Sequence, residues 1–193
     1  HDNGGTYVGV LNIENVRKWW PHTHGEPALY PLSLKIDGQK IDLGNTGFRQ
    51  IVINRGADGK DFALFCNGKP IFCRGAVWTN ADILNLSGTR ETYAPFLQLA
   101  RDASFNMLGT GAYETRAFYD LCAELGILIW QDFMFANFDY PTSNQDFSAS
   151  CSKEAADFLE TTQGNPALAV LCGGSEMYQQ AAMMGLPAAS WPQ

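Results

Sequence analysis

One carboxylate stands directly after a strand-like run and two glycines, in a segment whose residue types suit acid–base chemistry. The apolar residues Leu168–Cys172 predict a buried strand, and Gly173 and Gly174 then leave room for a ligand beside the backbone. Glu176 follows at the strand end, where a parallel α/β sheet carries its chemistry and where a general acid is needed. The same residue would also suit the start of a helix, because the helix dipole favours a carboxylate there. The pattern by itself leaves both interpretations open.

Aromatic side chains with nearby carboxylates mark other predicted strand ends. Trp78 is followed by Asp82, Trp130 is followed by Asp132, and Glu114 follows a tyrosine. Such groups suit sugars, because the C–H face of a sugar ring stacks on an aromatic ring while its hydroxyls bond to polar groups. Taken singly, each aromatic is more typical of core packing under a loop. Their recurrence at several strand ends is what indicates a sugar-binding surface.

Other common catalytic and cofactor motifs are absent from the sequence. Gly109-Thr-Gly111 has Glu114 where a dinucleotide fingerprint needs its third glycine, and a carboxylate there would repel a pyrophosphate. Ser175 lacks the glycine two residues later that a nucleophile elbow requires, and no histidine follows to complete a triad. His22 and His24 resemble half of a metal site, but no second ligand cluster accompanies them. We therefore predict no cofactor and no metal.

The composition indicates which classes of partner, and which cellular compartment, are expected for this chain. Thirteen basic and twenty acidic residues in a chain of 193 give a net charge of −7 without a basic stripe, so we expect no nucleic-acid partner. No apolar run reaches the roughly 18 residues of a membrane span, so we expect no membrane partner. The five cysteines form no C-x-x-C pair, and their odd number argues against a disulfide framework. A reducing compartment fits best, which favours the cytoplasm over the periplasm.

Short runs separated by turn signals occupy the first part of the chain and predict strands at 6–13, 30–36 and 47–53. Asp37-Gly38 lies between two such runs and predicts a hairpin, because both residue types accept positive φ. The pattern changes near residue 55. A complete immunoglobulin-type sandwich needs about seven strands, so about half of one is present.

Strand and helix patterns alternate through the rest of the chain. Continuous rather than alternating apolarity in its strands indicates burial on both faces, as in a parallel sheet. Right-handed crossovers then build either an open doubly wound sheet or the first half of a (β/α)8 barrel. The strands are predicted at 74–78, 105–108, 127–130 and 168–172, and the helices at 91–104, 115–125 and 153–162.

A family pattern runs through nearly the whole chain, in residues 118–136 (FYDLCAELGILIWQDFMFA), 66–75 and 19–30. These segments resemble the β-mannosidases of glycoside hydrolase family 2. The resemblance implies a multi-domain architecture, with 1–55 as the C-terminal part of an immunoglobulin-like β-sandwich and 56–193 as the first half of a (β/α)8 TIM barrel. It also implies a retaining exo-glycosidase that hydrolyses terminal β-D-mannose residues.

The resemblance further implies roles for single residues. Glu176 matches the general acid/base, and Ser175 stands where the family usually has an Asn that binds the sugar. Trp78 and Asp82 match the loop near the sugar pocket after the first barrel strand. Trp130 matches the block around the third strand. We therefore expect Ser175, Trp78, Asp82 and Trp130 to bind the substrate, a β-mannoside.

The second catalytic carboxylate of the family follows the seventh barrel strand, and this chain stops after the fourth. A retaining mechanism needs two carboxylates about 5–5.5 Å apart, so we expect the chain alone to be inactive. A half-barrel also leaves unpaired strand edges, which predicts self-association. Two alternatives stay open. One is another exo-glycosidase of the family, such as an exo-β-glucosaminidase, and the other is a non-catalytic carbohydrate-binding module.

Overall fold

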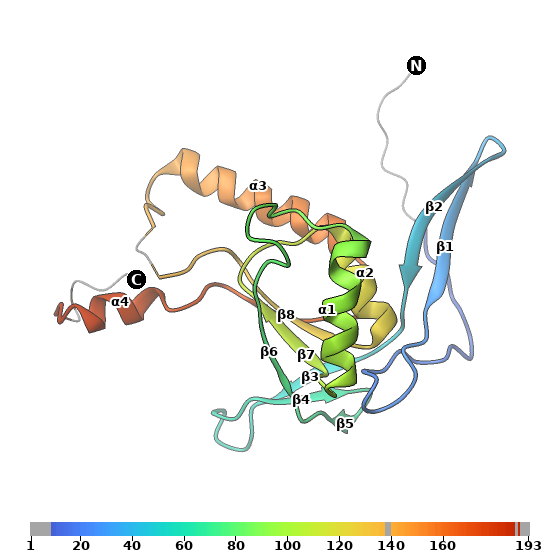
Figure 1. Cartoon of the computed structure of the whole chain (residues 1–193), viewed down its shortest axis with the longest axis horizontal. Coiled ribbons are helices and arrows are strands. Elements are labelled where there is room, and N and C mark those ends of the chain that lie inside the picture. Colours follow the sequence, from blue (N-terminus) through green and yellow to red (C-terminus); the bar gives the residue numbers. More distant parts are fainter. Residues whose placement is uncertain (1–8, 138–139, 188, 190–193) are drawn as a thin grey trace.

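The computed structural model describes residues 9–137, 140–187 and 189. Within them the strands form a two-stranded hairpin, a three-stranded sheet and a four-stranded sheet. The first two are antiparallel and the third is parallel, so the predicted change from hairpins to strand–helix alternation is confirmed. It falls after residue 70 and not near residue 55, because the three-stranded antiparallel sheet extends to that point. Figure 1 shows the hairpin standing at one side of the molecule and the three-stranded sheet lying below the parallel sheet.

The hairpin joins β1 (Tyr30–Ile36) to β2 (Gln39–Thr46) through the predicted turn. Asp37 and Gly38 have φ values of 49° and 84°, the left-handed conformations that a type I′ turn requires at both central positions. The predicted hairpin is therefore confirmed. Within the described residues, one face of this hairpin is apolar and exposed, and it comprises Leu32, Leu34, Ile36, Ile41 and Leu43.

The three-stranded sheet consists of β3 (Ile51–Asn54), β4 (Ala63–Cys66) and β5 (Lys69–Pro70). Each strand pairs with the next one along the chain in the antiparallel sense. The strand predicted at 47–53 is thus confirmed only in its second half. Residues 55–62, which include a turn at 57–58, link β3 to β4.

The strand predicted at 6–13 is wrong over residues 9–13, which adopt no regular structure. Residues 6–8 lie outside the described part of the chain. A strand forms only where its backbone groups find a hydrogen-bonding neighbour, and none of the described strands pairs with residues 9–13. The alternating pattern of the sequence carries no information on whether such a neighbour exists.

The parallel sheet carries its strands in chain order, and each strand pairs with the next. The strands are β6 (Gly75–Trp78), β7 (Met107–Thr110), β8 (Leu128–Asp132) and β9 (Leu168–Cys172). The bounds of β9 coincide with the predicted apolar run, because Pro166 precedes it and the two glycines follow it. β6 and β9 are the two edges of the sheet.

Helices connect these strands, and Figure 1 shows α1 and α2 side by side against the parallel sheet. The helix predicted at 115–125 is confirmed: Thr115 is its N-cap, and Gly126 ends it with a left-handed φ of 70°. No helix in the described part of the chain has the length and apolarity needed to cross a membrane. The helices are α1 (Arg90–Asp102), α2 (Arg116–Leu125), α3 (Gln145–Thr162) and, after β9, α4 (Met177–Met183).

Helix α3 begins at Gln145, well before the predicted start at residue 153. The Asn144 side chain caps it by accepting a hydrogen bond of 3.1 Å from the Phe147 N–H. The first two turns are rich in serine, which is a weaker helix former than alanine or leucine. The repeating pattern of apolar residues therefore starts later than the helix, which is why the predicted start is too late.

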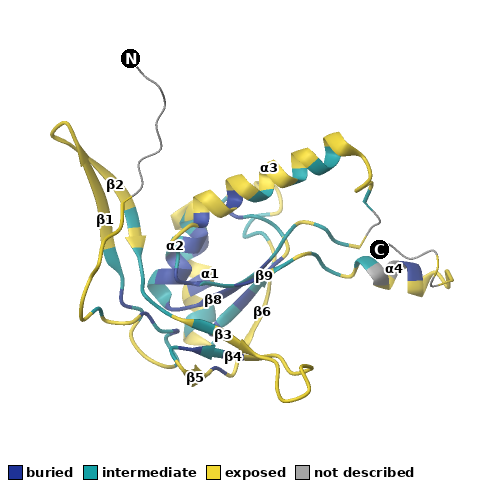
Figure 2. Cartoon of the chain, turned by 180° about the vertical axis from the view of Figure 1, so that it is seen from behind, coloured by how far each residue is buried: buried dark blue, intermediate teal, exposed yellow. Residues whose placement is uncertain are grey.

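The helices bury one face of the sheet and leave the other open. Ile127, Leu128 and Ile129 are fully buried, as their continuous apolar pattern predicted. The prediction that β6 is a buried strand is wrong, because Val77 is 80% exposed. β6 lies at the edge of the sheet, and no described element covers the face that carries Val77. Figure 2 shows the resulting contrast between exposed β6 and buried β8.

Gly75 and Gly109 form a matched pair for testing how β6 packs on β7. A β-carbon at Gly75 would lie 1.7 Å from the Met107 carbonyl oxygen, whereas one at Gly109 would meet no atom within 4 Å. The obstacle is backbone and cannot rotate aside. We expect Gly75→Ala to lower the free energy of unfolding by about 1–3 kcal/mol or more. We expect Gly109→Ala to change it by less than about 1 kcal/mol. Urea unfolding curves measure both, and equal effects would contradict this packing.

Candidate functional site

Beyond β9 the chain continues beside the segment that follows β8. The Ser175 N–H donates to the Phe135 carbonyl at 2.7 Å, and the Asn137 N–H donates to the Ser175 carbonyl at 3.1 Å. Gly174 permits this approach, because a β-carbon there would lie 2.8 Å from the Phe135 carbonyl oxygen. Gly173 has no atom within 4 Å of its β-carbon position. One glycine therefore serves backbone packing, and the other leaves open space as predicted.

Glu176 lies between this segment and α4, and its side chain is exposed. Its φ of 60° is left-handed, which is uncommon for a residue with a side chain. Such a conformation costs energy and persists only where the surrounding structure enforces it. Glu176 is thus both close to a strand end and directly ahead of a helix, so the structure is compatible with both interpretations of the sequence.

Asp82 belongs to the loop between β6 and α1 and folds back on that loop. Its carboxylate accepts hydrogen bonds of 2.8 Å from the Leu84 N–H and 3.0 Å from the Asn85 side chain. The Leu84 N–H, followed by the Asn85 side chain, lowers the pKa of Asp82 below its usual value. Asp82 is therefore ionised at neutral pH and held in a defined orientation within its own loop.

Trp78 ends β6, and its ring faces the helix layer. The ring centroid lies 4.9 Å from that of Phe118 and 6.2 Å from that of Tyr93. The indole N–H donates a hydrogen bond of 3.0 Å to the Glu114 carboxyl group. Trp78 is therefore packed between the sheet and the helices α1 and α2.

Trp130 lies on the other face of the same sheet. The strand register aligns Trp130 with Gly109 and Val77, whereas Trp78 falls one position later on β6. Because successive residues of a strand point to opposite faces, the two tryptophans cannot meet on one surface. The Trp130 indole N–H donates to the Asp132 carboxylate at 2.9 Å, so an aromatic ring and a carboxylate do share the open face.

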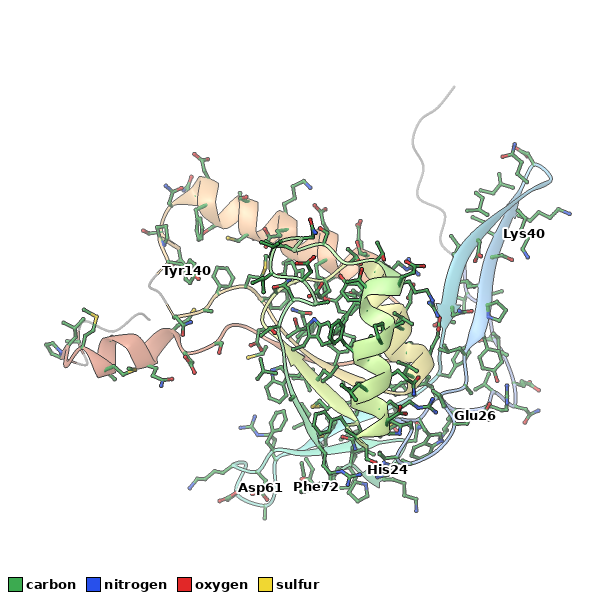
Figure 3. All side chains as sticks on the ribbon, viewed as in Figure 1. His24, Glu26, Lys40, Asp61, Phe72 and Tyr140 are labelled. Atoms are coloured by element: carbon green, nitrogen blue, oxygen red, sulfur yellow. The ribbon has the colours of Figure 1, made fainter. Side chains whose placement is uncertain are left out.

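An apolar cavity of about 350 Å³ adjoins Trp130 on the open face. Phe62 and Phe72 from the region of the three-stranded sheet line it together with Met107. The Phe62 ring centroid lies 5.3 Å from that of Trp130. Figure 3 shows Phe72 at the end of the molecule where β6 begins, well away from Tyr140, which follows β8. The cavity therefore lies toward the beginning of the strands and not at the end that carries Glu176.

The predicted site residues thus fall into separate groups. Ser175 and Glu176 follow β9 at one edge of the sheet, while Trp78 and Asp82 belong to β6 and its loop at the other edge. Among the described residues, no hydrogen bond links these two groups. Sequence reasoning also underrated Glu114, which it noted only as a carboxylate after a strand. This side chain is buried and accepts three hydrogen bonds.

His22 and His24 both take part in hydrogen bonds, and those of His22 reach segments far along the chain. The His22 Nε2 lies 2.7 Å from the Phe105 carbonyl oxygen, and the His22 backbone N–H donates to the Gly126 carbonyl at 2.9 Å. The His24 Nδ1 lies 2.8 Å from the Thr23 hydroxyl. In the described part of the chain, no group of three or more His, Cys, Asp or Glu side chains is arranged to hold a metal ion.

The sequence was compared with protein families and with curated proteins. No family model matches the chain. β-Mannosidase B of Neosartorya fischeri is 34% identical over 191 residues, which cover 94% of this chain and 22% of the relative. The Aspergillus niger β-mannosidase B is 34% identical over 91% of this chain and 22% of its own length. This chain is homologous to a segment of the β-mannosidases. The predicted resemblance is thereby confirmed, and the chain spans 22% of the length of these relatives.

Solved structures of two glycosidases share the fold of this chain. The β-D-mannosidase of Dictyoglomus thermophilum superimposes with a TM-score of 0.71 at 30% identity, over 87% of this chain and 22% of that one. An exo-chitosanase of Amycolatopsis orientalis gives a TM-score of 0.67 at 20% identity, over 80% of this chain and 19% of that one. The second likeness concerns the fold alone. Homology to the β-mannosidases therefore rests on the first structure and the curated relatives.

Proposed function

We propose that this chain supplies the acid/base part of the active site of a retaining exo-glycosidase that hydrolyses terminal β-D-mannose residues. The observation that carries the proposal is the homology to β-mannosidase B over 94% of the chain. The position of Glu176, shortly after the fourth parallel strand, agrees with an acid/base role. The activity belongs to a longer protein, because the matched relatives are several times the length of this chain.

The parallel sheet is, in this proposal, the first half of a (β/α)8 barrel. The chain-order arrangement of β6 to β9 supports a barrel, because a doubly wound sheet reverses its strand order at a switch point. Barrel enzymes carry their active sites at the carboxyl ends of the strands. The Asp82 loop and Glu176 both follow strands at that end of the sheet.

Residues 1–55 are, in the same proposal, the end of an immunoglobulin-like sandwich, and residues 56–193 form the barrel half. The exposed apolar face of the hairpin supports this division, because a two-stranded hairpin with one apolar face needs a further sheet to cover it. β3 and β4 pair across residue 55, so the two parts share the three-stranded sheet.

Glu176 would give its proton to the glycosidic oxygen as the bond to the leaving group breaks, while a second carboxylate takes up the mannosyl group. Glu176 would then accept a proton from the water that releases mannose. The two carboxylates must lie about 5–5.5 Å apart. Asp82 and Asp132 do not match the position of the family's nucleophile, which follows the seventh barrel strand. The proposal therefore places the nucleophile in a part of the enzyme other than this chain.

The substrate-binding residues of the proposal have different surroundings. Ser175 lies beside Glu176, where its hydroxyl can reach a sugar hydroxyl. Asp82 offers an ionised carboxylate from the β6–α1 loop. Trp130 faces the open side of the sheet, which would be the inside of the barrel. Trp78 supports the Asp82 loop from the helix side, because its indole is held by Glu114 and the aromatic rings of α1 and α2.

The test compares this chain with the complete gene product that contains it. Mass spectrometry gives the length of that product, and release of nitrophenol from p-nitrophenyl β-D-mannoside measures its activity. We expect the complete product to turn over the mannoside faster than p-nitrophenyl β-D-glucosaminide. A preference for the glucosaminide would favour an exo-β-glucosaminidase, and absence of turnover with retained sugar binding would favour a carbohydrate-binding module.

The isolated chain is expected to release no nitrophenol, because it lacks the second carboxylate. The control is the same chain with Glu176→Gln, which removes the one catalytic carboxyl group that the proposal assigns. Turnover by the chain that disappears in the Gln variant would contradict the need for a second carboxylate from elsewhere. Turnover at an unchanged rate in the variant would show that Glu176 does not contribute to it.

The isolated chain is also expected to associate with itself. β6 and β9 end the parallel sheet, and no described strand pairs with their outer edges. Open edges of apolar strands recruit other strands. Size-exclusion chromatography over a range of protein concentrations is expected to show species larger than the monomer. A clean monomer at every concentration would contradict this expectation.

A further inference from the structure

Glu114 is 9% exposed, and its carboxyl group is held by neutral donors. One oxygen accepts hydrogen bonds of 3.0 Å from the Trp78 indole and 3.4 Å from the Asn80 amide. The other accepts a hydrogen bond of 2.6 Å from the Tyr93 hydroxyl. None of the ion pairs in the described part of the chain includes Glu114. Burying a carboxyl group without a cation is costly unless such donors compensate, so the arrangement calls for an explanation beyond packing.

The donors to Glu114 lie at the two ends of one loop, residues 79–89 between β6 and α1. Trp78 and Asn80 stand where the loop begins. Asn80 also donates to the Leu86 carbonyl at 3.2 Å, which ties the beginning of the loop to its far side. Tyr93 lies in the first turn of α1, just after the loop ends. The Glu114 carboxyl group therefore closes the neck of this loop.

The far side of the neck is packed directly against Tyr93. The Gly88 N–H donates to the Tyr93 hydroxyl at 2.9 Å, and the Gly88 carbonyl accepts from the Thr115 hydroxyl at 2.9 Å. A β-carbon at Gly88 would lie 2.3 Å from the Tyr93 ring, so only glycine fits here without displacement of the ring. Tyr93 is fully buried. The loop is thus anchored to a rigid part of the core at the point where Glu114 holds Tyr93.

Beyond the neck, the body of the loop makes few hydrogen bonds to the rest of the molecule, although Ala81 packs against the core. Asp82 bonds only within the loop, to Leu84 and Asn85, in the hydrogen bonds of the described residues. Ile83 and Leu84 are 85% and 87% exposed. The direction in which the loop presents Asp82 therefore depends on how its neck is held.

The backbone of Glu114 is also connected to the third strand of the sheet. The Glu114 backbone N–H donates to the Tyr119 hydroxyl at 3.3 Å, and that hydroxyl donates to the Gln131 side chain at 2.7 Å. Burial raises the pKa of Tyr119, so its hydroxyl keeps the proton that it donates. Gln131 is fully buried and lies next to Trp130 and Asp132 on β8. Glu114 thereby links the loop after β6 to the end of β8.

We propose that Glu114 is a positioning residue that closes the neck of the 79–89 loop and so presents Asp82 to the substrate. The inference rests on the proposed function for the identity of the substrate, but its structural part does not. A positioning role predicts that loosening the neck weakens substrate binding more than it slows the chemical step. A purely stabilising role predicts lower stability with unchanged binding.

The experiment replaces Glu114 with Gln, which keeps the size of the side chain but puts an NH2 group opposite a donor. Hydrogen–deuterium exchange is measured on the 193-residue chain, and KM and kcat for p-nitrophenyl β-D-mannoside on the complete gene product. The control is Glu154→Gln, which changes an exposed carboxylate on α3. Asn80→Ala is a second variant that loosens the neck without altering a buried carboxyl group.

We expect the amides of residues 79–89 to exchange about tenfold faster or more in Glu114→Gln, and KM to rise by a similar factor, since a hydrogen bond to a carboxylate contributes that much. Asn80→Ala is expected to act in the same direction with a smaller effect, and Glu154→Gln to change neither quantity. If Glu114→Gln fails to fold, Asn80→Ala carries the test.

The outcomes separate this inference from the proposed function. Unchanged loop exchange in Glu114→Gln and Asn80→Ala would overturn the inference. A released loop with unchanged KM would overturn the role toward Asp82 and leave Glu114 as a stabilising residue. If the complete gene product does not hydrolyse the mannoside at all, the proposed function fails together with the substrate part of the inference. Loop exchange then still decides whether Glu114 closes the neck.

Discussion

Replacing Glu176 with Gln in the complete gene product is expected to lower kcat for methyl β-D-mannoside by about 10²–10⁴-fold, the usual contribution of general acid–base catalysis. Methanol is a poor leaving group, so its departure requires a proton. The amide of Gln is too weak an acid to supply this proton. The substitution keeps the size of the side chain, and Glu176 is exposed, so the fold should be unaffected.

The leaving group provides a sharp control for the role of Glu176. Nitrophenolate departs without protonation, so Glu176→Gln should slow the first step much less with the nitrophenyl mannoside than with the methyl mannoside. Ser175→Ala serves as the matched variant, because it changes the neighbouring residue without removing a proton donor. It should affect both substrates alike. Equal losses of kcat/KM on both substrates in Glu176→Gln would contradict an acid role, because kcat/KM reports the first step, in which the leaving group departs.

Elements with local signals are predictable from the sequence. The ends of α2 follow from Thr115 and Gly126, which the structure uses as N-cap and left-handed C-cap. The hairpin follows from Asp37-Gly38, because few residues accept positive φ at two successive positions. β9 follows from an apolar run bounded by a proline and two glycines. In each case the determinant lies within a few residues of the element.

Features that depend on distant neighbours are not predictable in this way. The exposure of Val77 follows from the edge position of β6, and the failure of residues 9–13 to form a strand follows from the absence of a described partner. Trp78 and Trp130 both follow apolar runs, and only the register of three strands shows that they face opposite ways. The sequence therefore found aromatic strand ends but could not tell which of them share a surface.

Glu114 illustrates the same limit for the candidate site. In the sequence it is one of several carboxylates after strands, and nothing local separates it from Asp82. In the structure Asp82 bonds within its own loop, while Glu114 is buried among donors from other elements. The partners Asn80 and Tyr93 lie far enough along the chain that no spacing rule connects them with Glu114. Burial and hydrogen bonding across elements are what distinguish the two carboxyl groups.

The largest expected effect on stability is that of Phe118→Ala, a loss of about 3–5 kcal/mol in the free energy of unfolding. Phe118 is fully buried on α2. Its ring centroid lies 4.9 Å from that of Trp78, 5.5 Å from that of Tyr93 and 5.4 Å from that of Tyr119. The substitution leaves a cavity and removes these aromatic contacts, each of which adds about 0.5–1.5 kcal/mol beyond area burial.

Phe96→Ala is the matched control. It removes the same side chain from the neighbouring helix α1, but Phe96 is 48% exposed and its ring lies 6.4 Å from that of Trp78. We expect it to cost less than about 1.5 kcal/mol, because water already covers much of the ring. Urea unfolding followed by circular dichroism measures both variants. Similar losses for the two would mean that Phe118 is not the centre of this cluster.

Two of the rings around Phe118 also hold the Glu114 carboxyl group, so stability and loop position are coupled at this point. Trp78 and Tyr93 contact Phe118 through their rings and Glu114 through their polar atoms. A cavity at Phe118 lets both rings shift, and their donors then leave the carboxyl group. Phe118→Ala is therefore expected to speed amide exchange in residues 79–89 as well as to destabilise the core, whereas Glu114→Gln should release the loop with a smaller loss of stability. A Phe118→Ala variant that is destabilised but keeps wild-type exchange in this loop would show that the neck does not depend on the aromatic core.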